Sequence, residues 1–176
     1  MEAAGLDTFR FFTIHGIQKT VYLFQVSIEK VSKRKVEATI LIESNPEKII
    51  AAFTEFEMLK DWWNVERSLV DKRSGGTYML LWGITDKGME YISSGIIEEY
   101  DPKVILKIKN FAYVCPNRPI LGNMTLEVRI EKWEGQSKVH LCQAGYQNGK
   151  HWDWYYSAVS KVWPEMLHVL KQYLEK

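Results

Sequence analysis

The C-terminal part of the chain carries one apolar stripe at helical spacing, and this stripe constrains the fold more than any other feature. After Asn148-Gly149, large apolar residues recur in steps of four and three, at Trp152, Tyr156, Val159, Trp163, Leu167, Leu170 and Leu174. The spacing predicts an amphipathic helix of about six turns with a single apolar face. The apolar face of such a helix has to pack against another long apolar surface of the fold. Pro164 lies inside the stripe and is expected to kink the helix, so that it can follow a curved partner.

A series of short strand-like segments precedes this helix. β-Branched, aromatic or alternating apolar residues mark residues 66–72, 77–82, 89–100, 104–108, 124–132 and 138–146. Turn residues stand between the segments, for example at 86–88 and 134–136. Short turns connect antiparallel neighbours, so the pattern predicts an antiparallel meander. Gly95 interrupts one long segment and predicts a bulge or a bend there.

The stretch before the meander predicts one more strand followed by a helical segment. Residues 36–43 are rich in β-branched side chains. Ser44 or Asn45 can cap a helix, and Pro46 suits its first position. Apolar residues then follow at helical spacing, at Ile49, Ile50, Ala52, Phe53, Phe56 and Leu59. We expect one helical stretch that ends near residues 61–64 and that buries Phe53 and Phe56. The whole order of elements predicts an α+β fold.

Composition and charge exclude several classes of protein. With 46% apolar and 26% charged residues, the chain of 176 residues has the balance of a soluble globular domain. Its net charge of +1 argues against a nucleic-acid partner. No apolar run approaches the ~20 residues of a membrane span. The four His and two Cys residues show no metal-ligand spacing. We therefore expect a cytoplasmic protein with no metal, no cofactor and no membrane partner.

Residues 1–34 differ from the rest and are expected to form an N-terminal extension to a domain spanning residues 35–176. Two strand-like segments flank His15-Gly16, so a hairpin is one interpretation of this extension and an irregular leader is the other. A further hypothesis is that the segment is an added or mis-annotated leader.

Short motifs occur in an order and at spacings that together indicate a family. They are Asn45-Pro46-Glu47-Lys48-Ile49, Leu59-Lys60-Asp61-Trp62-Trp63, Gly75-Gly76-Thr77-Tyr78, the run 95–102, and Val162-Trp163-Pro164-Glu165-Met166-Leu167. With them, about residues 35–176 resemble the START-like (SRPBCC) superfamily. More narrowly, the chain resembles the branch of homologues of the activator of the heat-shock chaperone ATPase, which also contains polyketide-cyclase-like members.

The resemblance implies a helix-grip fold. In this fold a curved antiparallel sheet of about six to seven strands wraps around the long C-terminal helix, and a short helical segment follows the first strand. The resemblance also implies that a tunnel between the sheet and the helix takes a small apolar ligand.

Aromatic residues from distant parts of the chain are expected to meet at one end of this tunnel. Trp, Tyr and Phe make up 13% of the chain. The residues expected to bind the ligand are Trp62, Trp63, Tyr78, Trp82, Tyr91, Tyr113, Gln143, Trp152, Tyr156 and Val159. Core packing is the alternative for each aromatic residue. Gln143 lies on the inward side of its strand, where its amide either bonds a tyrosine or a buried water, or awaits a polar group of the ligand.

No catalytic arrangement is predicted. The spacing shows no Ser-His-Asp, Cys-His or paired-carboxylate constellation. Asp153 is expected to cap the last helix or complement its positive end rather than act as a base. Binding of a small hydrophobic or amphipathic molecule is therefore the leading hypothesis. An enzyme of cyclase or hydrolase type that uses the same cavity and a co-regulator of a heat-shock chaperone are the alternatives. A homodimer through outer-face residues such as Met79 and Leu81 is also left open.

Overall fold

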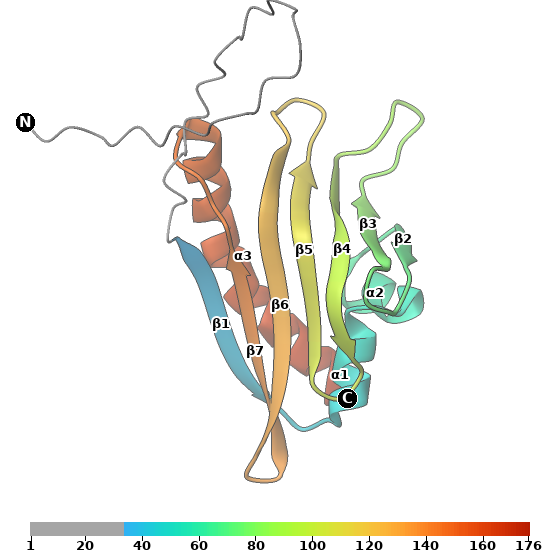
Figure 1. Ribbon diagram of the computed structural model, residues 1–176. Helices are drawn as coiled ribbons and strands as arrows, with labels where there is room; N and C mark the ends of the chain where they lie inside the picture. The colour runs from blue at the N-terminus through green and yellow to red at the C-terminus, as the bar shows by residue number, and fades with distance from the viewer. Residues whose placement is uncertain (1–33) are drawn as a thin grey trace, which may run out of the picture. The chain divides into compact units, whose positions relative to one another are not determined.

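The structure, a computed structural model, describes residues 34–176. Within them, seven strands form one antiparallel sheet in the order β1-β7-β6-β5-β4-β3-β2 (Figure 1). The strands are β1 (Lys35–Ile42), β2 (Arg67–Val70), β3 (Thr77–Trp82), β4 (Tyr91–Asp101), β5 (Ile105–Val114), β6 (Leu121–Trp133) and β7 (Gln136–Ala144). The helices are α1 (Pro46–Ala52), α2 (Phe56–Trp63) and α3 (Lys150–Leu174). Apart from Arg34, the predicted extension over residues 1–34 lies outside the described residues.

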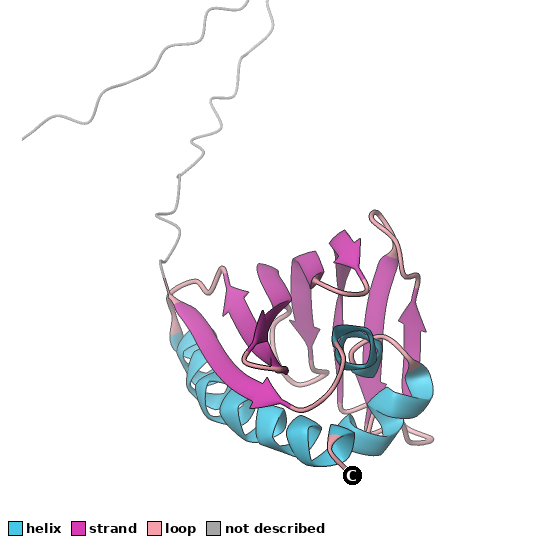
Figure 2. Cartoon of the chain, turned by 90° about the horizontal axis from the view of Figure 1, so that it is seen from below, coloured by secondary structure: helices cyan, strands magenta, loops and turns pink. Residues whose placement is uncertain are grey.

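The sheet curves around the long C-terminal helix. Figure 2 shows the strands as an arc with α3 along its inner side, and α1 and α2 beside the helix. Strands β3 to β7 follow one another through short connections, whereas β1 pairs with β7 at one edge. This arrangement confirms the predicted α+β helix-grip fold and its meander.

The helical segment after β1 begins where the sequence predicts. The side chain of Asn45 caps α1 by accepting a hydrogen bond of 2.7 Å from the backbone N–H of Lys48, and Pro46 opens the helix. The expectation of a single helical stretch is wrong, because the backbone turns out of helical geometry between α1 and α2. This break buries Phe53 completely but leaves Phe56 38% exposed, so Phe56 does not belong to the core as expected.

Strands β4 and β5 contain irregular points of the sheet. The register between these strands shifts between Ser94 and Ile96. A Cβ atom on Gly95 would lie only 2.5 Å from Cγ2 of Ile108, so the close approach of the strands requires glycine, as its place in the sequence indicates. On β5, Asn110 adopts a positive φ of 51° and breaks the alternation, which is why the sequence pattern ends this strand too early.

Helix α3 buries one side along its whole length. The buried residues are Tyr155, Val159, Trp163, Leu167, Leu170 and Leu174. The predicted stripe is therefore confirmed from Val159 onward, whereas in the first turns the buried tyrosine is Tyr155 and not Tyr156. Pro164 lies inside the helix without ending it.

The first turn of α3 carries the expected negative charge. Asp153 forms an ion pair of 2.6 Å with Arg34, just before β1, while Gly149 occupies the N-cap position. Asp153 thus complements the positive end of the helix but makes no side-chain cap. The Arg34 guanidinium also donates to the backbone carbonyl of Gln147. These contacts attach the start of β1 to the start of α3.

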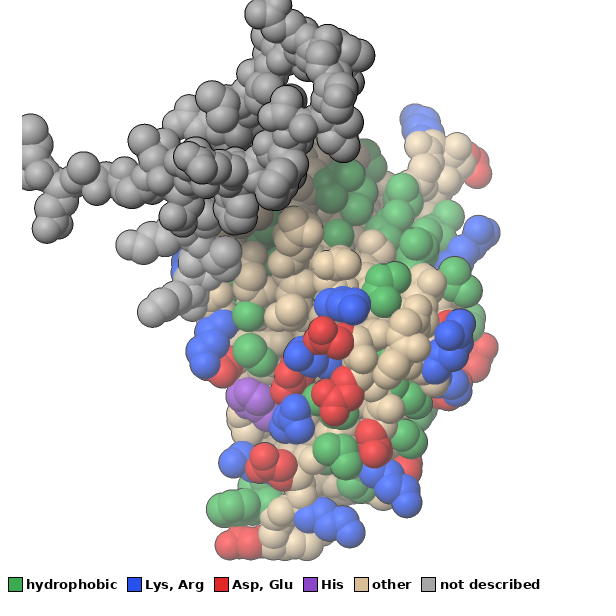
Figure 3. Space-filling view, viewed as in Figure 1, with side chains coloured by type: hydrophobic (Ala, Val, Ile, Leu, Met, Phe, Trp, Pro, Cys, Tyr) green, Lys and Arg blue, Asp and Glu red, His purple; other side chains and the backbone are tan. Residues whose placement is uncertain are grey.

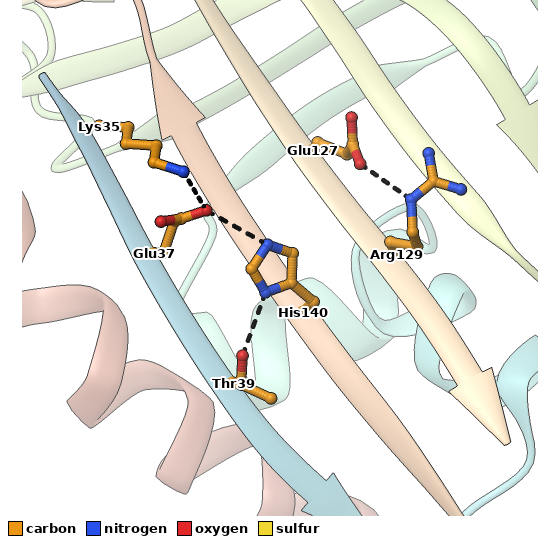
Figure 4. A network of polar contacts seen from close by, with 6 residues as sticks. All are labelled: Lys35, Glu37, Thr39, Glu127, Arg129 and His140. Carbon is orange, nitrogen blue, oxygen red and sulfur yellow. Dashed lines mark hydrogen bonds and ion pairs between the residues drawn. The ribbon is translucent and has the colours of Figure 1, made fainter. Parts of the chain in front are cut away.

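The outer face of the sheet is polar. Figure 3 shows acidic and basic side chains interspersed over this face. Strand alternation predicts that His140 points outward, and the side chain indeed lies between Thr39, at 3.1 Å, and Glu37, at 3.7 Å (Figure 4). Lys35 binds the same Glu37 carboxylate at 2.8 Å. The inner face of the same strands is apolar, and any enclosed site therefore lies between the sheet and α3.

Candidate functional site

A cavity of about 270 Å³ lies between the inner face of the sheet and the N-terminal half of α3. Its lining residues come from α2, β3, β4, β5, β7 and α3, and none of them carries a formal charge at neutral pH. They are Trp63, Trp82, Tyr91, Ser93, Phe111, Tyr113, Gln143, Trp154, Tyr155, Ala158, Val159, Val162 and Trp163. A concave, mostly apolar space with a few polar groups is the usual form of a small-molecule site.

A larger hollow of about 1320 Å³ lies elsewhere, along the β1–α1 connection and the β6–β7 hairpin. Exposed charged side chains such as Lys103 and Glu134 line it. Charged residues make up much of the lining of this hollow, whereas the smaller cavity is lined by uncharged and mostly aromatic residues and is therefore the better candidate for a ligand site.

Aromatic rings form a chain of contacts around the cavity. Ring centroids lie 5.3 Å apart between Trp163 and Trp63, 5.3 Å between Trp63 and Trp82, and 5.0 Å between Trp82 and Tyr91. The chain continues through Tyr113, 6.0 Å from Tyr91, to Tyr155, 4.8 Å from Tyr113. The indole of Trp82 also donates a hydrogen bond of 3.0 Å to the backbone carbonyl of Trp63. Contacts of this kind hold the rings in fixed positions relative to one another.

Gln143 closes this chain of contacts from the sheet. Its Oε1 accepts a hydrogen bond of 2.9 Å from the indole of Trp163, and its Nε2 donates one of 3.2 Å to the hydroxyl of Tyr155. The residue is 1% exposed, so each of these bonds satisfies a buried polar group. Of the two roles expected for Gln143, the amide therefore fulfils the first, since it bonds a tyrosine.

Burial sets the protonation of the tyrosines in the wall. It raises the pKa of Tyr155 well above its usual value, and the hydrogen bond from Gln143 offsets only part of this effect. Burial, together with the nearby Cys115 thiol, raises the pKa of Tyr113 to about 12. Burial also raises the pKa of Tyr91, with a smaller contribution from Glu90 and Glu66. All three groups remain neutral phenols at physiological pH.

Six of the ten residues expected to bind a ligand line the cavity. They are Trp63, Trp82, Tyr91, Tyr113, Gln143 and Val159. They come from six different elements, and the fold brings them together at the end of the domain where their meeting is expected.

Trp62 and Tyr78 lie outside the cavity, in the core beneath α1. The Trp62 indole donates a hydrogen bond of 2.7 Å to the carbonyl of Ala52, and the Tyr78 hydroxyl donates one of 3.2 Å to that of Phe53. Both carbonyls belong to the end of α1, where the helix itself leaves them without partners. Core packing, the alternative interpretation, describes these two residues.

Trp152 and Tyr156 also lie outside the cavity, on the side of α3 that faces the start of β1. The Tyr156 hydroxyl donates to the carbonyl of Lys35 at 3.4 Å. Rings of both residues contact Tyr146, with centroids 6.4 Å apart for Trp152 and 5.1 Å apart for Tyr156. They join the helix to the sheet edge instead of facing a ligand.

Seven residues of the wall are absent from the expected set, namely Ser93, Phe111, Trp154, Tyr155, Ala158, Val162 and Trp163. Most of them come from α3, where the two adjacent tyrosines make the phase of the apolar stripe ambiguous. Ser93 could have been found from strand alternation, since it faces inward two residues after Tyr91. No sequence signal marks Ala158 or Val162 as part of a wall.

The rim of the cavity carries a cationic contact. The Arg118 guanidinium, in the β5–β6 loop, lies 3.7 Å from the centroid of the Trp154 ring, which is 39% exposed.

Within residues 34–176, no three His, Cys, Asp or Glu side chains lie close enough together to hold a metal ion. None of the helices in this part of the chain is both long and apolar enough to cross a membrane.

A curved antiparallel sheet that grips a long C-terminal helix over an aromatic cavity defines a START-like (SRPBCC) domain. The family model of the Activator of Hsp90 ATPase homolog 1-like proteins matches residues 43–175, in agreement with this fold. The chain belongs to this family. No curated protein matches the chain significantly in sequence.

Solved structures share the fold at low sequence identity. The Aha1 dimer from Colwellia psychrerythraea is 19% identical over 81% of this chain and 96% of its own, with a TM-score of 0.62. A protein of unknown function from Staphylococcus aureus is 17% identical over 83% of this chain and 96% of its own, with a TM-score of 0.62. CalU16 from Micromonospora echinospora is 17% identical over 81% of this chain and 76% of its own, with a TM-score of 0.59.

Proposed function

We propose that the protein binds a small, largely apolar molecule in the cavity between the sheet and α3. The observation that carries this proposal is the chain of aromatic rings that, together with Gln143, surrounds a cavity of about 270 Å³. Eight of the thirteen lining residues are aromatic, which suits a flat ligand. Each Å² of apolar ligand surface that leaves water contributes about 25 cal/mol to binding.

The chemistry of the wall gives no support to an enzyme of cyclase or hydrolase type. Among the described residues, the titratable groups that line the cavity are the three tyrosines Tyr91, Tyr113 and Tyr155. Because burial raises the pKa of each, none of them can serve as a base near neutral pH.

Homodimer formation and co-regulation of a chaperone stay predictions. In favour of an interface, Leu69 on the edge strand β2 pairs with Met79 and is 59% exposed. Met79 and Leu81 themselves are only partly exposed. Light scattering tests for the dimer. An assay for stimulation of a chaperone ATPase by the purified protein tests co-regulation of a chaperone.

The ligand proposal is tested with N-phenyl-1-naphthylamine, a neutral probe that fluoresces in apolar surroundings. We expect saturable binding with one probe per chain and quenching of Trp emission. A matched pair of variants locates the probe, because Ala158 lines the cavity whereas its neighbour Ser157 is exposed and does not line it.

Ala158→Phe fills the cavity and should weaken probe binding about tenfold or more, while Ser157→Phe should leave it unchanged. Circular dichroism checks that both variants fold. Equal affinity in the wild-type protein and in a folded Ala158→Phe variant would contradict the proposal, as would the absence of binding to the wild-type protein.

A further inference from the structure

The wall of the cavity contains hydroxyl groups whose protons have no acceptor among the described residues. The Tyr155 oxygen accepts a hydrogen bond from Gln143 at 3.2 Å, but within residues 34–176 it donates none. Ser93 is 9% exposed, and its hydroxyl forms no hydrogen bond to this part of the chain. A hydroxyl proton rotates towards whatever acceptor is present. Both groups can therefore donate a hydrogen bond into the cavity.

The other buried polar groups of the wall are already engaged. The two donor positions of Gln143 Nε2 are directed at the Tyr155 hydroxyl and at Sδ of Met124, 3.5 Å away. Its Oε1 accepts from the Trp163 indole. The amide thus has no proton left for a ligand, and it fixes the position of the Tyr155 oxygen. The remaining hydrogen-bonding capacity of the buried wall lies in two hydroxyl groups, each with a proton to donate, of which Ser93 can also accept.

The wall also holds no charge that could compensate a charged ligand. None of the thirteen lining residues is acidic, basic or a histidine. Arg118 contacts the outer ring of Trp154 at the rim, outside the set of lining residues. An ionised group placed among these rings would lose its hydration without gaining a counter-charge.

We propose that the cavity selects an uncharged aromatic molecule carrying a ketone-type acceptor oxygen, and that the Tyr155 hydroxyl donates a hydrogen bond to this oxygen. The proposal rests on the proposed ligand-binding function and adds the chemical class of the ligand. It assigns the rings to the recognition of the flat apolar body, and Tyr155 to the recognition of the oxygen.

Three probes of nearly the same shape test this assignment. They are 2-acetonaphthone, 2-isopropenylnaphthalene, in which a CH₂ group replaces the ketone oxygen, and 2-naphthoate, which carries a negative charge. Their dissociation constants are measured by quenching of Trp fluorescence in the wild-type protein, in Tyr155→Phe and in Tyr156→Phe. Tyr156→Phe is the matched control, because it removes a phenol oxygen from the adjacent residue, which lies outside the cavity and bonds Lys35.

We expect Tyr155→Phe to weaken binding of the ketone about two- to tenfold, which is the size of one net hydrogen bond, and to leave the affinity for the hydrocarbon unchanged. Tyr156→Phe should leave both affinities unchanged. The naphthoate should bind the wild-type protein more weakly than the ketone. An unchanged affinity for the hydrocarbon also demonstrates that the Tyr155→Phe cavity is intact.

Infrared spectroscopy of ¹³C-labelled 2-acetonaphthone provides a readout on the wild-type protein itself. A hydrogen bond from Tyr155 lowers the carbonyl stretching frequency below that of the ketone in an apolar solvent. A frequency equal to that in the apolar solvent would overturn the proposal, as would a ketone affinity that Tyr155→Phe does not change or a naphthoate that binds more tightly than the ketone. Failure of all three probes to bind would instead overturn the proposed function.

Discussion

The indole Nε1 of Trp163 lies 2.9 Å from Oε1 of Gln143 and donates a hydrogen bond to it, which connects the middle of α3 to strand β7. The same amide bonds the hydroxyl of Tyr155, nearer the start of the helix. One buried side chain of the sheet therefore positions two aromatic residues of the helix, and these two residues form adjoining parts of the cavity wall. The shape of the cavity depends on this amide.

Gln143→Leu should destabilise the protein because it leaves the indole N–H of Trp163 buried without a partner. The expected loss in free energy of unfolding is about 1–3 kcal/mol, measured by urea denaturation. Gln136→Leu is the control, since Gln136 lies on the same strand and bonds Glu43 at an exposed position. That variant should change the free energy by less than about 0.5 kcal/mol. Equal losses in the two variants would show that the buried amide is not the source of the effect.

Substitution by Phe should reduce mainly stability at Trp62, and mainly ligand affinity at the neighbouring Trp63. Trp62→Phe removes the indole donor to the Ala52 carbonyl and should reduce the free energy of unfolding by about 1–3 kcal/mol, with little effect on affinity for N-phenyl-1-naphthylamine. Trp63→Phe changes the cavity wall and should weaken probe binding. Fluorescence titration and urea denaturation of both variants separate these effects. A larger loss of affinity in Trp62→Phe would contradict the assignment of Trp62 to the core.

Tyr146→Phe should stabilise the protein or leave its stability unchanged. The Tyr146 hydroxyl is buried and has no hydrogen-bond partner among the described residues. Burying a hydroxyl without a partner costs about 1–3 kcal/mol, and the substitution removes this cost while keeping the ring contacts with Tyr155 and Tyr156. Thermal denaturation provides the measurement. A marked drop in melting temperature would mean that the hydroxyl has a partner.

Stability should fall as the pH rises above about 10, the usual pKa of a tyrosine in the unfolded chain. In the folded protein the pKa of Tyr113 is raised to about 12, chiefly by burial, so between these two values the folded state binds more protons than the unfolded state. The free energy of unfolding therefore decreases with pH in this window. Denaturation at a series of pH values should show a shallower decrease in Tyr113→Phe. The same slope in the variant and in the wild-type protein would contradict this account.

Strand alternation and turn residues were sufficient to predict the sheet and the inward direction of Gln143. The regular period of two residues makes such an assignment possible from the sequence alone. The same reasoning fails where the period is interrupted, as at Asn110 with its positive φ, beyond which Phe111 and Tyr113 continue the strand.

The phase of α3 shows a second limit of sequence reasoning. Tyr155 and Tyr156 are adjacent, and either of them fits a stripe that continues to Val159. Which tyrosine faces the cavity depends on partners from other elements, namely Gln143 for Tyr155 and the Lys35 carbonyl for Tyr156. These contacts exist only in the folded chain, so periodicity alone could not select between the two residues.

The sequence predicted where the site lies, but not which residues line it. Aromatic residues concentrate where a cavity forms, yet a buried indole can equally donate a hydrogen bond to a backbone carbonyl in the core. The Trp62 indole and the Tyr78 hydroxyl bond carbonyls at the end of α1. Their role follows from the break between α1 and α2, which the helical pattern of the sequence does not reveal.

The most direct test of ligand binding in this cavity is a titration of ¹⁵N-labelled protein with 2-acetonaphthone, followed through the indole N–H resonances of its seven tryptophans. Four tryptophans line the cavity, namely Trp63, Trp82, Trp154 and Trp163, whereas Trp62, Trp133 and Trp152 lie elsewhere. We predict that the resonances of the first four shift to saturation with one ligand per chain, while the other three barely move. Shifts confined to Trp62, Trp133 or Trp152, or the absence of any saturable shift, would contradict the account.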